Sequence, residues 1–245
     1  MAYNIQSIYA GPPYPQGKYI GVTSGEECRG YVFYGMMPPS RFSQDRIVDN
    51  ILLLEDITEI PDNACYYTTN LRVFQYFGPI TKLGKQAFMR SGVTLFISKS
   101  SDKNVIPAGV TEVPDSCFRG CTNLTNLTWH DNITVFDQYA LALDSVGLTI
   151  KNTELPTSLE TIGNGALSNQ QIPFTKIPKN VKTIGTNAFS SNYALTELTF
   201  EGTPTSIGAA FQNCNNLLTI NVPWAEGAVS GAPWGATNAT INYNQ

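Results

Sequence analysis

The segment 181–200, VKTIGTNAFSSNYALTELTF, carries apolar residues at uneven gaps of one to six positions. This spacing does not fit a helix, whose apolar face recurs about every 3.6 residues, and it does not fit a strand, whose side chains alternate between two faces. The same uneven spacing recurs along most of the chain. The feature that constrains the fold is therefore a sequence repeat, not any single helix or strand.

Two landmarks recur together in seven copies of the repeat, which follow one another at 22 to 30 residues. The first landmark is one apolar residue, found at Ile60, Leu83, Val113, Phe136, Ile162, Ile184 and Ile207. The second is a small residue followed by a larger one, found at Ala64-Cys65, Ala87-Phe88, Cys117-Phe118, Ala140-Leu141, Ala166-Leu167, Ala188-Phe189 and Ala210-Phe211. In four copies a strand start follows six residues later, at Leu71, Leu124, Leu195 and Leu217.

A repeat of this length predicts a stacked solenoid. The commonest spacing is 23 residues, which falls within the range of leucine-rich repeats, where each unit adds one strand to a parallel sheet. One unit cannot bury its own apolar edge, so neighbouring units must stack. The segments 71–76, 124–129, 195–200 and 217–222 follow L-x-x-L-x-apolar, whose first, fourth and sixth residues are predicted to point inward. We predict a mainly β leucine-rich-repeat solenoid of about seven coils, with a parallel sheet on one face and non-repeat caps at both ends.

The repeat resembles the BspA-like, treponemal-type leucine-rich repeat, V-x-x-I-G-x-x-A-F-x-x-C-x-x-L-x-x-L-x-I-P. The segments 110–129, 181–200 and 206–223 carry the resemblance, which extends over about residues 48–223. The resemblance implies the solenoid fold. For function it implies membership of a family that mixes adhesins, surface proteins and uncharacterised proteins of gut bacteria and their phages.

The two ends lie outside the repeat. Residues 1–47 are rich in Tyr, Gly and Pro and contain candidate strands at 18–22 and 30–35. We interpret them as a cap over the open end of the solenoid or, alternatively, as an attachment or oligomerisation element. Residues 48–223 are assigned to the solenoid. Residues 224–245, which contain Trp224 and Trp234, are interpreted as a C-terminal cap, with a tryptophan-based ligand site as the alternative.

Composition narrows the classes of partner. Only 14% of the residues are charged and the net charge is -4, so we expect no binding to nucleic acid. No apolar run reaches the roughly 18 residues of a membrane span, and the first residues do not resemble a signal peptide. We therefore expect a chain that stays in the cytoplasm or is assembled into a virion or surface particle. The five cysteines have no disulfide-framework spacing and are expected to be buried free thiols.

No residue pattern in the sequence indicates a catalytic group. The one histidine, His130, lies just past a predicted strand, and no G-x-S-x-G nucleophile motif is present. Cys117 and Cys121 have the wrong spacing for a redox or zinc motif, and core packing with turn hydrogen bonds explains them better. The segment 78–85 departs from a phosphate loop in spacing and lacks its Ser/Thr. We predict no catalytic residue, no metal site and no cofactor, and thus no enzyme.

What remains for function is the outward face of the sheet. Equivalent positions on successive coils place short polar side chains there, and these are the candidate binding residues: Gln75, Asn126, Thr128, His130, Glu197, Thr199, Glu201, Thr219 and Asn221. We interpret the chain as a recognition or adhesion module for a protein or glycan, in a phage particle or bacterial-surface assembly whose other subunits contact residues 1–47. The alternative is a structural decoration or assembly subunit with no ligand of its own.

Overall fold

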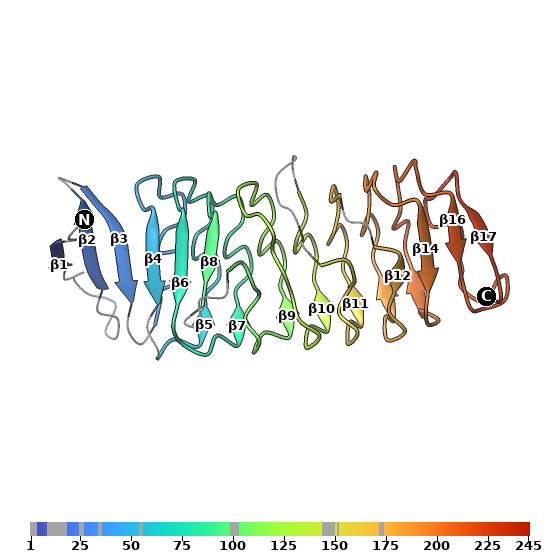
Figure 1. Ribbon diagram of the computed structural model, residues 1–245, viewed down its shortest axis with the longest axis horizontal. Helices are drawn as coiled ribbons and strands as arrows, with labels where there is room; N and C mark the ends of the chain where they lie inside the picture. Colours follow the sequence, from blue (N-terminus) through green and yellow to red (C-terminus); the bar gives the residue numbers. More distant parts are fainter. Residues whose placement is uncertain are drawn as a thin grey trace.

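The protein is a β-solenoid built from strands and turns, with no helix among the described residues (Figure 1). The computed structural model describes residues 4–8, 19–24, 27–33, 36–53, 56–98, 103–143, 150, 152–171 and 174–245. Their strands are β1 (Asn4–Ile8), β2 (Tyr19–Ser24), β3 (Glu27–Phe33), β4 (Asn50–Leu53), β5 (Glu59–Ile60), β6 (Val73–Tyr76), β7 (Lys82–Leu83), β8 (Leu95–Ile97), β9 (Glu112–Val113), β10 (Val135–Phe136), β11 (Thr161–Ile162), β12 (Lys176–Ile177), β13 (Thr183–Ile184), β14 (Glu197–Phe200), β15 (Ser206–Ile207), β16 (Thr219–Asn221) and β17 (Thr240–Asn242).

Each coil contributes strands to two faces of the solenoid. The major face holds the sheets β1-β2-β3-β4-β6-β8 and β12-β14-β16-β17, with the bridges Val105–Thr128 and Leu127–Ile150 between them. The minor face holds the sheets β5-β7 and β15-β13-β11-β10-β9. From β4 onward every described pair of neighbouring strands is parallel, as expected when the chain advances one coil per turn.

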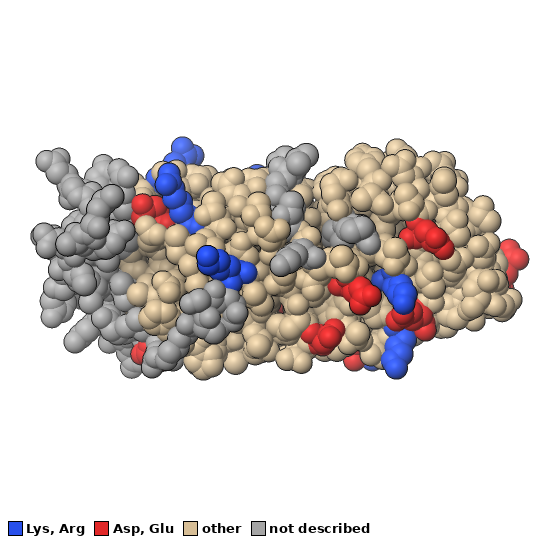
Figure 2. Space-filling model, viewed as in Figure 1, with Lys and Arg blue, Asp and Glu red and all other residues tan. Residues whose placement is uncertain are grey.

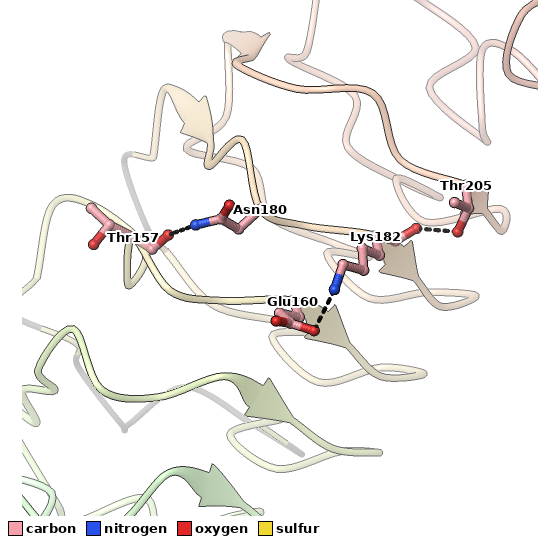
Figure 3. A network of polar contacts seen from close by, with 5 residues as sticks. All are labelled: Thr157, Glu160, Asn180, Lys182 and Thr205. Carbon is pink, nitrogen blue, oxygen red and sulfur yellow. Dashed lines mark hydrogen bonds and ion pairs between the residues drawn. The ribbon is translucent and has the colours of Figure 1, made fainter.

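The minor face was not predicted from the sequence, although its landmarks were. All seven apolar landmarks, Ile60 to Ile207, are the inward-pointing second residues of the two-residue strands β5, β7, β9, β10, β11, β13 and β15. Main-chain hydrogen bonds and side chains both tie the coils together here. Figure 3 shows Asn180 donating to the carbonyl of Thr157 (2.9 Å), Lys182 paired with Glu160 (2.8 Å), and the Thr205 hydroxyl donating to the carbonyl of Lys182 (2.9 Å).

The residues predicted to point inward from the major face are buried, which confirms the repeat register. The first, fourth and sixth places of the four strand segments are at most 7% exposed; they are Leu71, Phe74, Tyr76, Leu124, Leu127, Trp129, Leu195, Leu198, Phe200, Leu217, Ile220 and Val222. The small-then-large pairs are also buried. Phe189 stacks on Phe211 of the next coil, with ring centroids 5.4 Å apart and planes 12° apart, so these aromatic rings fill the space between the two coils.

The turns between the two faces form a third hydrogen-bonded ladder. The main-chain N–H groups of Asn187, Phe189 and Ser191 donate to carbonyls of the following coil at 2.9 to 3.0 Å. Asn187 and Ser191 adopt the left-handed conformation, with φ of 59° and 58°, so that alternate N–H groups face the next coil. Asn and Gly, which adopt this conformation at little cost, occupy several of the equivalent places, among them Asn63, Gly120 and Gly165.

A buried residue with a hydrogen-bond donor lies at the end of six of the described turns. It is occupied by Thr68, Ser91, Cys121, Gln170, Asn192 and Cys214, which we call the donor column. Thr68 Oγ1 donates to the carbonyl of Phe42 at 2.7 Å, and Cys121 Sγ donates to that of Phe88 at 2.9 Å. Gln170, Asn192 and Cys214 likewise donate to a carbonyl of the preceding coil. Cys121 and Cys214 are thus structural hydrogen-bond donors, in agreement with the sequence interpretation.

Regular coil geometry begins ahead of residue 48, where the sequence analysis placed the start of the solenoid. The main-chain N–H groups of Ser40, Phe42 and Gln44 donate to the next coil at 2.6 to 3.2 Å, as in the later turns. Before this turn, β2 and β3 form an antiparallel hairpin near the predicted strands 18–22 and 30–35, of which Lys18, Tyr34 and Gly35 lie outside the described residues. The strand β1, which was not predicted, pairs antiparallel with β2.

The C-terminal segment closes the other end of the core. Trp224 and Trp234 are 6% and 1% exposed and lie against Phe200, with ring centroids 5.2 and 6.0 Å from it. The segment also makes a further strand, β17, which pairs parallel with β16. Because both indole rings are buried in the packing, they are not a surface for a ligand.

Candidate binding surface

The structure divides the nine predicted binding residues among three places on the solenoid. Glu197, Thr199, Glu201, Thr219 and Asn221 lie together on or beside β14 and β16 at the C-terminal half. Asn126, Thr128 and His130 lie on a middle coil, and Gln75 lies on β6 in the N-terminal half. The outward face is therefore not one continuous polar site.

The C-terminal group forms a network that connects three coils. Asn221 Nδ2 donates to Glu197 Oε1 at 2.8 Å and to Thr199 Oγ1 at 3.3 Å. Asn242 Nδ2, from β17, donates to Asn221 Oδ1 at 2.9 Å. The parallel register places Glu197 beside Thr219 and Thr199 beside Asn221. The side-chain amide of Asn221 is therefore held from both sides, so this part of the surface is ordered before any ligand arrives. We call it the C-terminal polar ladder: Lys176, Glu197, Thr199, Glu201, Thr219, Asn221 and Asn242.

Two members of this ladder were missed in the sequence analysis. Lys176, on β12, forms an ion pair with Glu201 at 3.4 Å, and both side chains are about half exposed (56% and 44%). Asn242 lies in the segment that was assigned to the cap. A signal for it was present, because residues 240–242 repeat the tripeptide Thr-Ile-Asn of residues 219–221, and the two tripeptides pair directly.

The middle group is partly used by the fold itself. Thr128 pairs with Val105, and its hydroxyl lies 3.4 Å from the carbonyl of Asn104. The main-chain N–H of Asn132 donates to His130 Nδ1 at 3.2 Å, which leaves Nε2 to carry the hydrogen and donate to the carbonyl of Pro107 at 2.9 Å. Both ring nitrogens of His130 are thus engaged by main chain, so the half-buried ring joins two coils, although the sequence placed it among the candidate binding residues.

Gln75 stands among apolar neighbours. In the register of β4, β6 and β8 it lies between Leu52 and Ile97, and Val73 lies beside Leu95. Sequence reasoning extended a polar face across the whole sheet, but the outward side chains of these strands are mostly apolar. Asn104, at the end of the polar insertion 98–104, is buried and accepts a hydrogen bond from the Phe96 N–H at 2.8 Å; residues 99–102 of that insertion lie outside the described residues.

The cysteine thiols described by the structure are free and buried. Burial raises the pKa of Cys121 to about 12 and raises those of Cys65 and Cys117 well above their usual value. A thiol that remains protonated is a poor nucleophile and a poor metal ligand. Within the described ranges there is no cluster of His, Cys, Asp and Glu suited to a metal ion, and no helix there has the length and apolarity of a membrane span.

Charge is sparse and unevenly spread over the surface. Figure 2 shows Lys and Arg over the coils of β4 to β8, at the upper left, and more frequent Asp and Glu over the C-terminal coils. The stacked parallel coils, the inward leucines and the two strand-bearing faces define a leucine-rich-repeat solenoid, whose exposed positions differ from coil to coil while its core positions do not.

The family follows from the repeat itself. The model of the BspA type leucine-rich repeat region matches six copies in this chain, over residues 36–94 and 92–217. The chain therefore belongs to the BspA-type leucine-rich repeat family. This repeat architecture is typical of interaction or surface modules, because stacked coils present extended binding surfaces. No curated protein matches the chain.

The solved structures to which the chain is similar share little sequence with it. A leucine-rich cell surface protein of Faecalibacterium prausnitzii is 18% identical, with 96% of each chain covered and a TM-score of 0.40. A leucine-rich repeat protein of Bacteroides ovatus is 15% identical, with 98% of this chain and 75% of that chain covered and a TM-score of 0.48. One of Eubacterium ventriosum is 16% identical, with 92% and 76% covered and a TM-score of 0.43.

Proposed function

We propose that this protein is a non-enzymatic recognition or adhesion module that binds a protein or glycan through the C-terminal polar ladder. The observation that carries the proposal is the set of hydrogen bonds through Asn221, which fixes Glu197, Thr199 and Asn242 in one array. Flexible polar side chains lose rotamer freedom when they bind a ligand, and this loss weakens binding. Side chains already fixed by their neighbours avoid most of that loss.

The roles of the chemically reactive side chains support a non-enzymatic function. His130 has both ring nitrogens on main-chain groups. Cys121 donates to a carbonyl from inside the core, where its thiol is inaccessible. These residues are therefore used to hold coils together.

We also propose that the module is part of a phage particle or a bacterial-surface assembly, in which residues 1–47 contact the other subunits. The antiparallel β1-β2-β3 unit supports this assignment, because it differs in topology from the coils and ends the sheet in a strand paired on one side only within the described part of the chain. A strand edge of this kind is a template for pairing with another chain.

A binding comparison with matched variants tests the proposal. The fluorescently labelled full chain is applied to a glycan array and to intact gut bacteria, alongside Glu197→Lys and Thr219→Lys. The controls, Glu160→Lys and Ser206→Lys, introduce lysine at two exposed positions of the minor face. We expect binding that falls at least tenfold in the ladder variants and is unchanged in the controls.

Two results would contradict this function. Absence of binding by the wild-type chain would favour the structural decoration subunit that the sequence left as the alternative. Equal loss in both pairs of variants would show that the added charge acts without regard to face, so that the ladder is not the site.

A further inference from the structure

One coil in the N-terminal half is shorter than its neighbours at the edge where the chain enters the major face. Six residues separate Cys65 from Leu71, and six separate Phe118 from Leu124, but only five separate Phe88 from Val93. Gly92 takes up the shortening by approaching the previous coil so closely that a Cβ on it would lie 2.0 Å from the carbonyl oxygen of Thr69. Gly92 therefore places no side chain of its own between Asn70 and Asn123, which occupy the equivalent position on the neighbouring coils.

A depression of about 720 Å³ lies at this edge, where Gly92 contributes no side chain. Gly92 lies between its two walls, and Arg46, Arg72, Thr69, Thr94 and Asn123 are among the other residues that line it. This edge lies away from the C-terminal polar ladder, so the depression is a separate feature of the surface. Its size is in the range of ligand pockets, which hold about 300–1,000 Å³.

The depression is basic in a chain that is acidic overall. Arg46 and Arg72 are both exposed, and neither guanidinium group makes a hydrogen bond or ion pair with another residue of the described part of the chain. One carboxylate, Asp49, lines the same space, and its Oδ1 accepts a hydrogen bond from the Asn50 amide at 2.6 Å. Two cations against one anion leave a net positive site.

The main-chain groups of Arg72 and the N–H of Gly92 are already used by the fold. The N–H of Arg72 donates to the carbonyl of Asp49 at 2.7 Å, and the carbonyl of Arg72 accepts from the N–H of Thr94 at 3.0 Å and its hydroxyl at 2.9 Å. The N–H of Gly92 donates to the carbonyl of Thr68 at 2.9 Å. Beside the two arginines and Gly92 these groups are therefore not open to a ligand, and a ligand there is recognised mainly through side chains.

The side chains offer groups for hydroxyls as well as for an anion. Asn123 donates its NH₂ group to the carbonyl of Gly92 at 3.4 Å, and Asn70 donates likewise to the carbonyl of Arg46. These bonds fix each amide and leave its oxygen as an acceptor for a ligand hydroxyl, and Thr69 and Thr94 add hydroxyl groups of their own. Ile47, which is 55% exposed, adds an apolar contact at the margin.

We propose that this depression is a binding site for a carboxylate-bearing saccharide, such as a chain of uronic acids. Arginine forms paired, charge-assisted hydrogen bonds with carboxylates, and it does so better than lysine because its donors are planar. The amide and hydroxyl groups around the two arginines match the hydroxyl groups of the sugar ring. The site uses none of the residues of the C-terminal polar ladder, so either proposal can fail while the other stands.

Isothermal titration of the full chain with trigalacturonate, compared with neutral galactotriose, tests the site. We expect trigalacturonate to bind and galactotriose to bind at least tenfold more weakly. Added salt should lower the affinity for trigalacturonate. Arg72→Gln and Arg46→Gln should each lower the affinity for trigalacturonate about tenfold, because the loss of one hydrogen bond to a charged group weakens binding by about that factor. Lys82→Gln, which removes one exposed cation from the minor face, should leave it unchanged.

Two further ligands decide what the site recognises. Glutarate, a free dicarboxylate, and an acidic glutamate peptide are titrated in the same way. Glutarate binding as tightly as trigalacturonate would make this a simple anion site, and tighter binding of the peptide would make it a protein-binding site; either result overturns the saccharide assignment. Absence of trigalacturonate binding, or equal binding by Arg72→Gln with an unchanged circular-dichroism spectrum, also overturns it.

Discussion

The side-chain amide of Asn192 reaches back one coil and donates a hydrogen bond of 2.9 Å to the main-chain carbonyl of Leu167. The same NH₂ group also donates to the carbonyl of Phe189 at 2.7 Å. Its Oδ1 atom is buried without a hydrogen-bond partner among the described residues. Asn192 therefore supplies the donor that the donor column requires and adds an acceptor that the column does not use.

This arrangement predicts opposite results for two substitutions at position 192. Asn192→Leu should lower the free energy of unfolding by about 1–3 kcal/mol, because it leaves the carbonyl of Leu167 without a donor, whereas that of Phe189 still accepts from Cys214. Asn192→Cys should be neutral or stabilising, because it keeps a donor, as at Cys214, and removes the unused acceptor. Urea denaturation followed by circular dichroism measures both. If the two variants lose the same stability, the hydrogen bond to Leu167 is not what the position contributes.

The buried thiols predict a loss of stability at alkaline pH. Burial raises the pKa of Cys121 to about 12, whereas an unfolded thiol titrates near 8.5. The unfolded state then loses its proton first, so the contribution of this thiol is complete below about pH 8.5 and declines as the pH rises toward 12. At pH 10 the loss amounts to roughly 2 kcal/mol for this one thiol.

Cys121→Ser isolates this effect, because the hydroxyl keeps a donor and does not titrate in this range. Unfolding midpoints of the wild type and Cys121→Ser, measured in urea at pH 7 and pH 10, should converge or cross as the pH rises. A constant difference between the two proteins at both pH values would contradict the proposed titration.

Close contact between coils predicts that Gly84 cannot be replaced. A Cβ at this position would lie 2.2 Å from the carbonyl carbon of Pro61 and 2.3 Å from the nitrogen of Asp62, both main-chain atoms that cannot rotate away. Gly84→Ala should therefore lower the unfolding free energy by about 3 kcal/mol through overpacking. Ser206→Ala, at an exposed strand position, serves as the control. A Gly84→Ala protein that melts within a degree of the wild type would show that the coils can separate freely.

The terminal packing predicts where unfolding begins when the C-terminal end is weakened. Trp234 is 1% exposed and contacts Phe200 and Trp224, so Trp234→Ala should cost about 3–5 kcal/mol through the lost contacts and the resulting cavity. Because each coil contacts only its neighbours, amide exchange should accelerate in β16 and β17 more than in β9 and β10. Uniform acceleration along the chain would indicate that the solenoid opens as one unit.

The core of this fold could be predicted because burial repeats with the coils. Leu195 and Phe189 each have equivalents on other coils, and seven copies of one spacing outweigh the irregularity of any single copy. The shared position of Cys121 and Cys214 was also visible, although the carbonyls that they bind were not. What these residues share is a donor group, and Thr, Ser, Cys, Gln and Asn all provide one.

The parts that the sequence did not reveal have physical reasons for being hidden. Strands of two residues, such as β13, are too short to show an alternating pattern, so the minor face was not predicted. The strand β17 follows two tryptophans that break the spacing of the repeat. The depression beside Arg72 arises from one residue that is absent from the coil of Gly92, and a missing residue becomes visible only when neighbouring coils are in register.

The direction of the strands sets how this protein responds to force. The strands cross the long axis, β1 to β3 lie at one end and β17 lies at the other (Figure 1), so the hydrogen bonds between coils run along the axis. Tension between the two ends loads these bonds one coil at a time instead of shearing many together. The molecule should therefore lengthen in small steps at low force, and behave under load as an extensible tether instead of a rigid rod.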